Sequence, residues 1–223
     1  MKLRQRLVVV FFRGLTSLMC RIDDAQLARV PLRGPLIIYT NHVNVLEIPI
    51  IYTRLHPRPL HGLAYADRWK NRLIGWLLDA CESIPLHRGE PDITALRAGI
   101  ERLRQGHILL ISPEGTRSGH GRLQVAHAGV VTLALHSGAP LLPIAYVGGE
   151  HYKENLRRLR RTDFRLAVGQ PLRLEARGAR ATREVREQML NELMHELAAL
   201  MPEEFRGEYG GPRPASAMYV QRA

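Results

Sequence analysis

The stretch Pro35–Glu47 reads PLIIYTNHVNVLE and predicts how the fold is built around it. It opens with an apolar run, Pro35–Tyr39, which is typical of a short buried strand. Asn41 and Asn44 follow the run and favour a turn, and Pro49 suits the first turn of a helix. The stretch therefore predicts a strand, then a turn, then a helix.

His42 lies in the predicted turn, and Glu47 lies five residues later, at the predicted helix start. On one continuous helix this separation would point the two side chains to different sides, so a turn between them is needed for contact. A carboxylate that holds one imidazole nitrogen leaves the other free to take a proton from an alcohol near neutral pH. The helix dipole also favours the ionised form of Glu47. The pair predicts a general base with its orienting carboxylate, although an incidental histidine in a surface turn fits the isolated spacing equally well.

A second stretch, His107–Ser118, reads HILLISPEGTRS and again predicts a buried strand followed by a polar turn. Gly115 can adopt backbone geometry that lets N–H groups converge on an anion. Arg117 adds a planar guanidinium that matches two phosphate oxygens at once. The turn therefore predicts an anion site, and the alternative is an ordinary polar turn in which Glu114 and Arg117 pair with each other.

Four ordered blocks of this chain resemble the glycerolipid acyltransferase family, which is typified by 1-acylglycerol-3-phosphate acyltransferase. The first block is Asn41-His42 followed by Glu47, and the second is the apolar stretch from Ser83 that ends at Arg88 and Gly89. The third block is Glu-Gly-Thr-Arg-Ser, at residues 114–118, and the fourth is the proline-containing run at residues 139–144. The likeness covers residues 28–210. Four blocks in the family's order make a chance match improbable, and the third block is the most specific.

Two positions depart from the family pattern. Glu47 stands where the family usually has Asp, which lengthens the carboxylate arm by one methylene and still allows it to orient a histidine. After the third block the family often shows Phe-Lys-x-Gly, whereas this chain reads Ala126-His127-Ala128-Gly129. The missing lysine changes the expected phosphate contacts.

The resemblance implies transfer of an acyl group from an acyl thioester to a hydroxyl of 1-acylglycerol 3-phosphate, which gives phosphatidic acid. It implies that His42 is the general base, that Glu47 orients it, and that Asn41 and His127 support the site. It also implies a set of phosphate-binding residues, namely Arg88, Glu114, Gly115, Thr116, Arg117 and Ser118. The resemblance implies no metal and no cofactor, with acyl-CoA or acyl-carrier protein as co-substrate. The alternatives are another lysophospholipid, glycerol phosphate or aminolipid acceptor, or a catalytically inactive basic protein that binds membrane or nucleic acid.

The charge balance indicates an anionic partner. The formal net charge is +11 and the sequence pI is about 10.4. Aromatic residues make up only 6% of the chain, and no run interleaves Lys or Arg with stacking aromatics as single-strand binders do. We therefore expect an anionic membrane surface and no nucleic acid, with the protein peripheral on the cytoplasmic face of the cell membrane. The basic cluster from Lys153 to Arg165 fits that location.

Alternating strand and helix patterns predict an α/β fold, a single domain with a mixed, mostly parallel central sheet flanked by helices. We expect residues 1–27 to form an amphipathic interfacial segment, because they are basic and apolar but too short to span a bilayer. The alternative is a first helix packed on the domain. We expect residues 28–205 to form the acyltransferase domain and residues 206–223 to form a mobile tail.

Several further elements follow from periodicity and capping. The sequence predicts a helix capped by Asp92, a helix ended by Gly138, and an edge strand at residues 164–168. It also predicts a strand at residues 141–147 and a helix at residues 182–201. Between residues 57 and 82, basic residues lie beside Trp69 and Trp76, which fits either contact with lipid headgroups or core packing.

Overall fold

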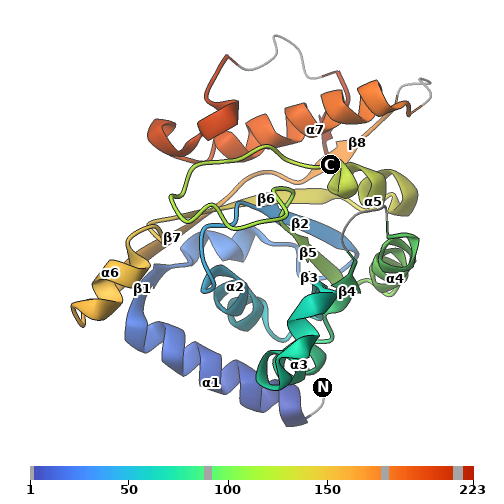
Figure 1. Cartoon of the computed structure of the whole chain (residues 1–223). Coiled ribbons are helices and arrows are strands. Elements are labelled where there is room, and N and C mark those ends of the chain that lie inside the picture. The colour runs from blue at the N-terminus through green and yellow to red at the C-terminus, as the bar shows by residue number, and fades with distance from the viewer. Residues whose placement is uncertain (1–2, 88–91, 177–180, 213–217) are drawn as a thin grey trace.

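The computed structural model describes residues 3–87, 92–176, 181–212 and 218–223. A nine-stranded sheet forms its centre, with the strands of the main path in the order β1-β7-β6-β2-β5-β3-β4 (Figure 1). The strands are β1 (Cys20–Asp23), β2 (Leu36–Thr40), β3 (Leu60–Tyr65), β4 (Ile84–Leu86), β5 (Ile108–Ile111), β6 (Leu141–Val147), β7 (Thr162–Val168), β8 (Leu172–Leu174) and β9 (Val220–Arg222). The α-helices are α1 (Leu3–Met19), α2 (Glu47–Leu55), α3 (Arg72–Ala80), α4 (Ile93–Arg104), α5 (Gly129–Ser137), α6 (Tyr152–Arg157) and α7 (Arg183–Ala198). Short 3-10 turns lie at η1 (Ala25–Arg29), η2 (Ala66–Lys70), η3 (Glu203–Phe205) and η4 (Gly207–Tyr209).

Most strand pairs in the sheet are parallel. β2 pairs in parallel with both β5 and β6, β3 with β4 and β5, and β1 with β7. The antiparallel pairs are β6–β7, β6–β8 and β8–β9. The predicted α/β fold with a mixed, mostly parallel sheet is confirmed.

The two faces of the sheet are covered by different helices. On β2, Ile37 and Tyr39 face α4, α5 and α7, whereas Leu36 and Ile38 face α2. Every residue of β2 is buried, because in a parallel sheet covered on both faces neither side of the strand meets water. α1 packs outside α2 and forms a further layer on that side (Figure 1).

Local signals placed several elements correctly. Asp92 caps α4, since its carboxylate accepts a hydrogen bond from the Ala95 N–H at 2.9 Å. Gly138 ends α5 in the left-handed conformation, with φ 65°. β6 spans the predicted residues 141–147.

The predicted strand at residues 164–168 is confirmed as part of β7, but the prediction that it lies at the edge of the sheet is wrong. The strand is longer and begins at Thr162, and it lies between β6 and β1 in the sheet. Its outer partner β1 comes from the N-terminal segment, which the sequence alone did not place in the sheet.

The N-terminal residues are part of the domain, as the alternative reading of that segment proposed. α1 buries Val8 and Val9 against the domain, and β1 continues directly from the helix into the sheet. The Arg161 side chain fixes the junction, donating to the carbonyl oxygens of Ser17 at 2.7 Å and Cys20 at 2.6 Å. Contact between the remaining face of α1 and a membrane stays a prediction. None of the described helices is both long and apolar enough to cross a bilayer.

The prediction of a mobile tail from residue 206 is wrong for most of the described part of that range. Residues 220–222 form β9, which pairs with β8. The buried carboxylate of Glu192 on α7 accepts three successive backbone N–H groups, from Met218, Tyr219 and Val220, at 2.8–3.0 Å. Three hydrogen bonds to one carboxylate stabilise this C-terminal segment. Glu192 lies more than twenty residues before the segment in the sequence.

Candidate active site

The two predicted motifs lie next to each other at the carboxyl ends of β2 and β5. β2 and β5 are parallel neighbours with Tyr39 opposite Ile111, so the loops that follow them start side by side. The backbone joins these loops directly, because Ser118 N–H donates to the His42 carbonyl at 2.8 Å and Gly119 N–H to the Val43 carbonyl at 3.1 Å. Segments about seventy residues apart in the sequence therefore form one site.

His42 and Glu47 are in contact across the predicted turn. The His42 Nδ1 atom lies 2.9 Å from Glu47 Oε2, and the other carboxylate oxygen accepts the backbone N–H groups of Val43 and Asn44. The Glu47 side chain is fully buried, while 23% of the His42 side chain remains exposed. The histidine is thus held from one side by a carboxylate and is open to a substrate on the other.

Burial raises the pKa of Glu47 above its ordinary value, and the hydrogen bonds from His42, Asn44 and Val43 oppose that rise. In these contacts both carboxylate oxygens serve as acceptors, which is the role of the ionised form. The turn that wraps around Glu47 therefore favours the ionised carboxylate against the effect of burial.

Strand β6 holds the His42 loop in place. The Asn41 amide exchanges two hydrogen bonds with the backbone of Tyr146, at 2.8 and 2.9 Å, and so continues the β2–β6 pairing past the strand end. The Asn44 amide donates to the Gly149 carbonyl at 2.7 Å, and the Tyr146 hydroxyl donates to the Glu47 carbonyl at 3.0 Å. Asn41 holds the loop to β6 through these bonds, and its supporting role in the reaction stays a prediction, whereas no local signal pointed to Tyr146.

The Gly115 turn has the backbone geometry that the sequence predicted. Gly115 has φ 65°, and a Cβ atom there would lie 3.3 Å from the Tyr65 hydroxyl and 3.5 Å from His127 Cδ2. Tyr65 ends β3, the neighbour of β5 on its other side, so a third strand contributes to the site. His127 lies beside the turn, as the prediction of a supporting residue requires.

Glu114 does not fit its predicted role as a phosphate ligand. Its buried carboxylate accepts the His42 N–H through Oε1 at 2.8 Å and the Gln124 N–H through Oε2 at 2.9 Å. Burial raises the pKa of Glu114, and these hydrogen bonds oppose the rise. A carboxylate used in this way joins two loops, and its negative charge would repel a phosphate. The alternative pairing with Arg117 is also absent from the described contacts, because the Arg117 side chain points into solvent.

The remaining residues of the third block differ in their accessibility. Thr116 and Arg117 are exposed and can reach a ligand. The Ser118 hydroxyl accepts the Gly121 N–H at 3.2 Å, which shapes the loop. Arg88 lies outside the described residues.

An open pocket of about 640 Å³ adjoins the Gly115 turn. Its residues come from the third block, the loop after it and the C-terminal segment, namely Glu114, Thr116, His120, Arg122, Leu123, Gln124, Val125, His127, Gly207 and Glu208. The charged groups of this lining are mixed in sign, because Arg122 lies in it together with the carboxylates of Glu114 and Glu208. Within the described residues, no three His, Cys, Asp or Glu side chains come together as a metal-ligand group.

Residues 120–127, which we call the pocket loop, are held in place by residues 205–209. Sequence reasoning missed this contribution. Leu123 exchanges backbone hydrogen bonds with Phe205 at 3.0 Å and Glu208 at 3.3 Å. The Tyr209 hydroxyl accepts the Ala126 N–H at 3.2 Å. These contacts connect segments about eighty residues apart, so no local pattern could have indicated them.

The comparison with known families agrees with this geometry. The family model described as Acyltransferase matches residues 21–147, more than half of the chain, and this range contains both loops of the site. This chain belongs to the glycerolipid acyltransferase family.

Similar proteins carry related names. A 1-acyl-sn-glycerol-3-phosphate acyltransferase of Bacillus subtilis is 27% identical over 143 residues, which is 64% of this chain and 69% of that protein. A lyso-ornithine lipid O-acyltransferase of Pseudomonas aeruginosa is 31% identical over 114 residues, 51% of this chain and 43% of that protein. The crystal structure of a 1-acyl-sn-glycerophosphate acyltransferase from Thermotoga maritima superposes with a TM-score of 0.64 at 21% identity, covering 88% of this chain and 78% of that one. At that identity the structural match concerns the fold.

Proposed function

We propose that this acyltransferase moves a fatty acyl group from an acyl thioester to the free hydroxyl of 1-acylglycerol 3-phosphate and so forms phosphatidic acid. The observation that carries the proposal is the 2.9 Å contact between His42 and the fully buried Glu47 at the end of β2. A protein that only binds membranes has no need of this pair. The names of similar proteins, such as the Bacillus subtilis relative, supply the acceptor.

The chemistry follows from the tautomer that Glu47 selects. With its Nδ1–H donated to the carboxylate, His42 has a free lone pair on Nε2. That nitrogen takes the proton of the acceptor hydroxyl while the oxygen attacks the thioester carbonyl carbon. The C–S bond of the tetrahedral intermediate then breaks, and the proton on Nε2 passes to the departing thiolate. The products are an ester and a free thiol, with His42 returned to its starting state.

The acceptor phosphate would bind beside the Gly115 turn. Arg117 and Thr116 are exposed there, and the pocket wall adds His120, Arg122 and His127. Arg117→Ala should raise the KM for the acceptor roughly tenfold to a hundredfold, because a hydrogen bond to a charged group contributes about 1.5–3 kcal/mol. Steady-state kinetics with each substrate varied in turn measures this effect. Arg104→Ala on α4, which removes an exposed arginine outside the site, is the matched control. An equal loss of donor hydrolysis without acceptor would indicate a structural role for Arg117 instead.

A second acceptor class has support from one position. Glu208 places a carboxylate on the wall of the pocket, opposite in sign to Arg122. Such a mixed wall suits a zwitterionic or amino-bearing headgroup, and one similar protein is named as a lyso-ornithine lipid O-acyltransferase. We therefore keep an aminolipid acceptor as the second candidate.

We further propose that the protein works as a peripheral protein on the cytoplasmic face of the cell membrane, where both lipid acceptor and thioester donor are available. Exposed apolar side chains along α1 and the basic cluster at residues 153–165 support this location. The donor would be acyl-CoA or acyl-carrier protein. Within the basic cluster Arg161 donates to the backbone of Ser17 and Cys20, and Arg158 pairs with Glu154 at 3.0 Å. The other exposed cations of the cluster, which would carry the attraction, are Lys153, Arg157, Arg160 and Arg165.

The test is a thiol-release assay with acyl-CoA and with acyl-carrier protein across a panel of acceptors. The panel contains 1-acylglycerol 3-phosphate, lysophosphatidylethanolamine, lyso-ornithine lipid, glycerol 3-phosphate and no acceptor. We expect the highest kcat/KM with 1-acylglycerol 3-phosphate, and a loss on the order of 10²–10⁴-fold in His42→Ala. A higher kcat/KM for an amino-bearing acceptor would favour the second candidate. Absence of transfer to every acceptor by folded protein would overturn the proposal.

A further inference from the structure

The two tryptophans of the chain lie in different surroundings. Trp69 in η2 donates its indole N–H to Asp79 at 2.8 Å, and its backbone approaches Gly75 closely. Trp76 on α3 is 44% exposed, next to Leu73 at 69%. The structure thus separates the two readings of this region, because Trp69 has a packing role whereas Trp76 projects from the surface.

α1 carries two apolar faces. One face, which includes Val8 and Val9, is buried against the domain. A second stripe is exposed at helical spacing and consists of Leu3, Leu7, Val10, Phe11 and Leu18. At 100° per residue this stripe lies opposite the buried face, so folding leaves it without a partner in the described structure.

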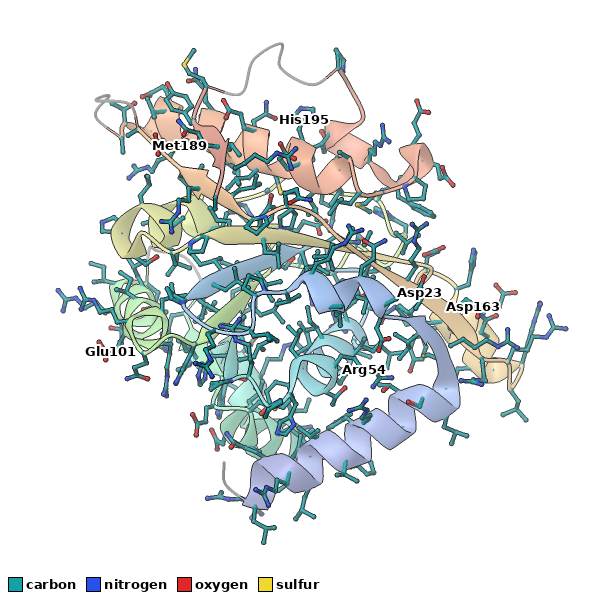
Figure 2. All side chains as sticks on the ribbon, turned by 180° about the vertical axis from the view of Figure 1, so that it is seen from behind. Asp23, Arg54, Glu101, Asp163, Met189 and His195 are labelled. Carbon is teal, nitrogen blue, oxygen red and sulfur yellow. The ribbon has the colours of Figure 1, made fainter. Side chains whose placement is uncertain are left out.

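Helices α1 and α3 lie on one side of the molecule. The two helices are in contact with each other, and both lie on the side of α2 that faces away from the sheet, in the front view and in the view from behind (Figures 1 and 2). α7 lies on the opposite side of the sheet. We name the exposed stripe of α1 together with Leu73, Ile74 and Trp76 of α3 the α1–α3 surface.

Cations surround this surface. α1 contains Arg4, Arg6 and Arg13, all exposed, and no acidic residue. η2 and α3 add exposed cations at Arg68, Lys70 and Arg72, together with the acids Asp67 and Asp79, so that cations outnumber acids six to two over α1, η2 and α3. Long basic side chains beside an apolar stripe can reach anionic headgroups while their stems lie along the apolar region.

We propose that α3 is a second membrane-contacting element and that the α1–α3 surface lies on an anionic bilayer with Trp76 at headgroup level. This inference rests on the proposed function, to which it adds the orientation of the protein on the membrane. A second copy of the chain is a poorer occupant of the surface. A symmetric dimer there would bring the same arginines and lysine face to face, and like charges in an interface are unfavourable.

The first experiment uses the two tryptophans as position reporters in the full-length chain. Trp69→Phe leaves Trp76 as the only indole, and Trp76→Phe leaves Trp69. Each variant is mixed at low salt with phosphatidylglycerol–phosphatidylcholine vesicles whose acyl chains are brominated or not, since bromine quenches only nearby indoles. We expect brominated vesicles to quench Trp76 strongly and Trp69 weakly. Equal quenching, or none for Trp76, would overturn the proposal.

The second experiment removes the apolar side chains from α3 and leaves both motifs unchanged. Leu73→Ser with Trp76→Ser should weaken vesicle binding roughly a hundredfold, because each large apolar side chain moved out of water contributes about a factor of ten. Met218→Ser is the matched control, since Met218 is an exposed apolar residue anchored to α7 on the opposite side. Unchanged binding by the double variant would contradict the proposal.

The same samples separate failure of the inference from failure of the proposed function. Wild-type protein that sediments with vesicles while Trp76 stays unquenched refutes the role of α3 and leaves peripheral binding intact. Protein that does not sediment at all, yet acylates detergent-dispersed acceptor, refutes membrane binding and leaves the enzyme assignment intact. A concentration-dependent dimer that Leu73→Ser with Trp76→Ser abolishes would assign the surface to a second copy and overturn the proposal.

Discussion

At the scale of single residues, the His42 imidazole owes its orientation to a carboxylate that has no contact with water. The Glu47 side chain is fully buried and accepts two backbone N–H groups besides the histidine. Glu fits here because the turn wraps around the longer arm. The family's usual Asp would have to reach the same donors from one methylene further away.

Glu47 variants test this arrangement. Glu47→Gln should lower kcat strongly, because its amide has one oxygen where the carboxylate offers two, and an NH₂ group placed toward a backbone N–H is repelled. Glu47→Asp should retain more activity, since it keeps the charge that selects the His42 tautomer. The kcat and thermal unfolding of both variants are measured together. A Gln variant with wild-type kcat would show that Glu47 only caps α2.

At the scale of elements, two histidines are in contact near the amino-terminal ends of β3 and β5, away from the site. His61 lies in β3, and His107 directly precedes β5. His61 Nε2 lies 3.0 Å from His107 Nδ1, and His61 Nδ1 lies 3.0 Å from the Glu82 carbonyl. Burial lowers the pKa of both histidines, and Arg102 lowers both further. The folded protein therefore holds the pair neutral where the unfolded chain would begin to bind protons.

This pair predicts a loss of stability in acid. Stability contributed by a histidine of lowered pKa is present above its ordinary pKa of 6.5 and is lost as the pH falls below that value. Glu47 and Glu114, whose pKa values are raised, act in the opposite direction, so the comparison must be with a variant. His61→Gln should show a smaller drop in melting temperature than wild type between pH 7.5 and 5.5. His136→Gln, at an exposed position on α5, is the control. Parallel curves for His61→Gln and wild type would contradict the prediction.

A second link between elements runs from the C-terminal segment to His42, the proposed general base. Tyr209 holds the pocket loop through Ala126, and Gln124 in that loop is bonded to Glu114, which holds the His42 N–H. Each step is a hydrogen bond to the backbone, so a shift at one end changes the position of the loop at the other.

Tyr209→Phe tests that link. It leaves the Ala126 N–H without its acceptor, and a buried unpaired donor costs about 1–3 kcal/mol. We expect a raised KM for the acceptor, because the loop lines the proposed phosphate pocket, and a lowered kcat, because the same loop is bonded to the carboxylate that holds the His42 N–H. Tyr219→Phe, at a buried tyrosine whose backbone is bonded to Glu192, is the matched control. Equal effects of the two variants on KM would indicate general destabilisation.

At the scale of the whole molecule, α1 combines a packed inner face with an exposed apolar outer face. Its inner face packs on the domain, its C-terminal end leads into β1, and its outer stripe is exposed. Removing the segment would therefore remove a layer and a strand as well as the proposed membrane contact.

Deleting residues 1–22 should lower the free energy of unfolding by at least about 3 kcal/mol, since Val8 and Val9 each contribute about 1.5–3 kcal/mol when buried. Leu7→Ser with Phe11→Ser should instead weaken binding to anionic vesicles with little change in melting temperature, because both side chains are exposed. Binding by wild type should also decrease with salt, as screening shortens the reach of the surface charge. A deletion variant as stable as wild type would show that α1 is an appendage.

The sequence by itself determined the elements and the chemistry that depend on neighbouring residues. The apolar runs before Asn41 and Ser112, the Asp92 cap and the left-handed Gly115 all follow from local preferences. The His42–Glu47 contact also belongs here, since only a five-residue turn separates the two side chains.

Only the tertiary structure decided what depends on distant partners. Local sequence predicts that Glu114 belongs to an anion site. In the folded chain its carboxylate instead accepts the N–H of His42, 72 residues away. Local sequence predicts that β7 lies at the edge of the sheet, but β1 pairs with it. It also predicts that the C-terminal residues form a tail, but Glu192 accepts their N–H groups. In each case a buried polar group or strand edge needs a partner, and the folded chain supplies it from a segment that no local pattern can identify.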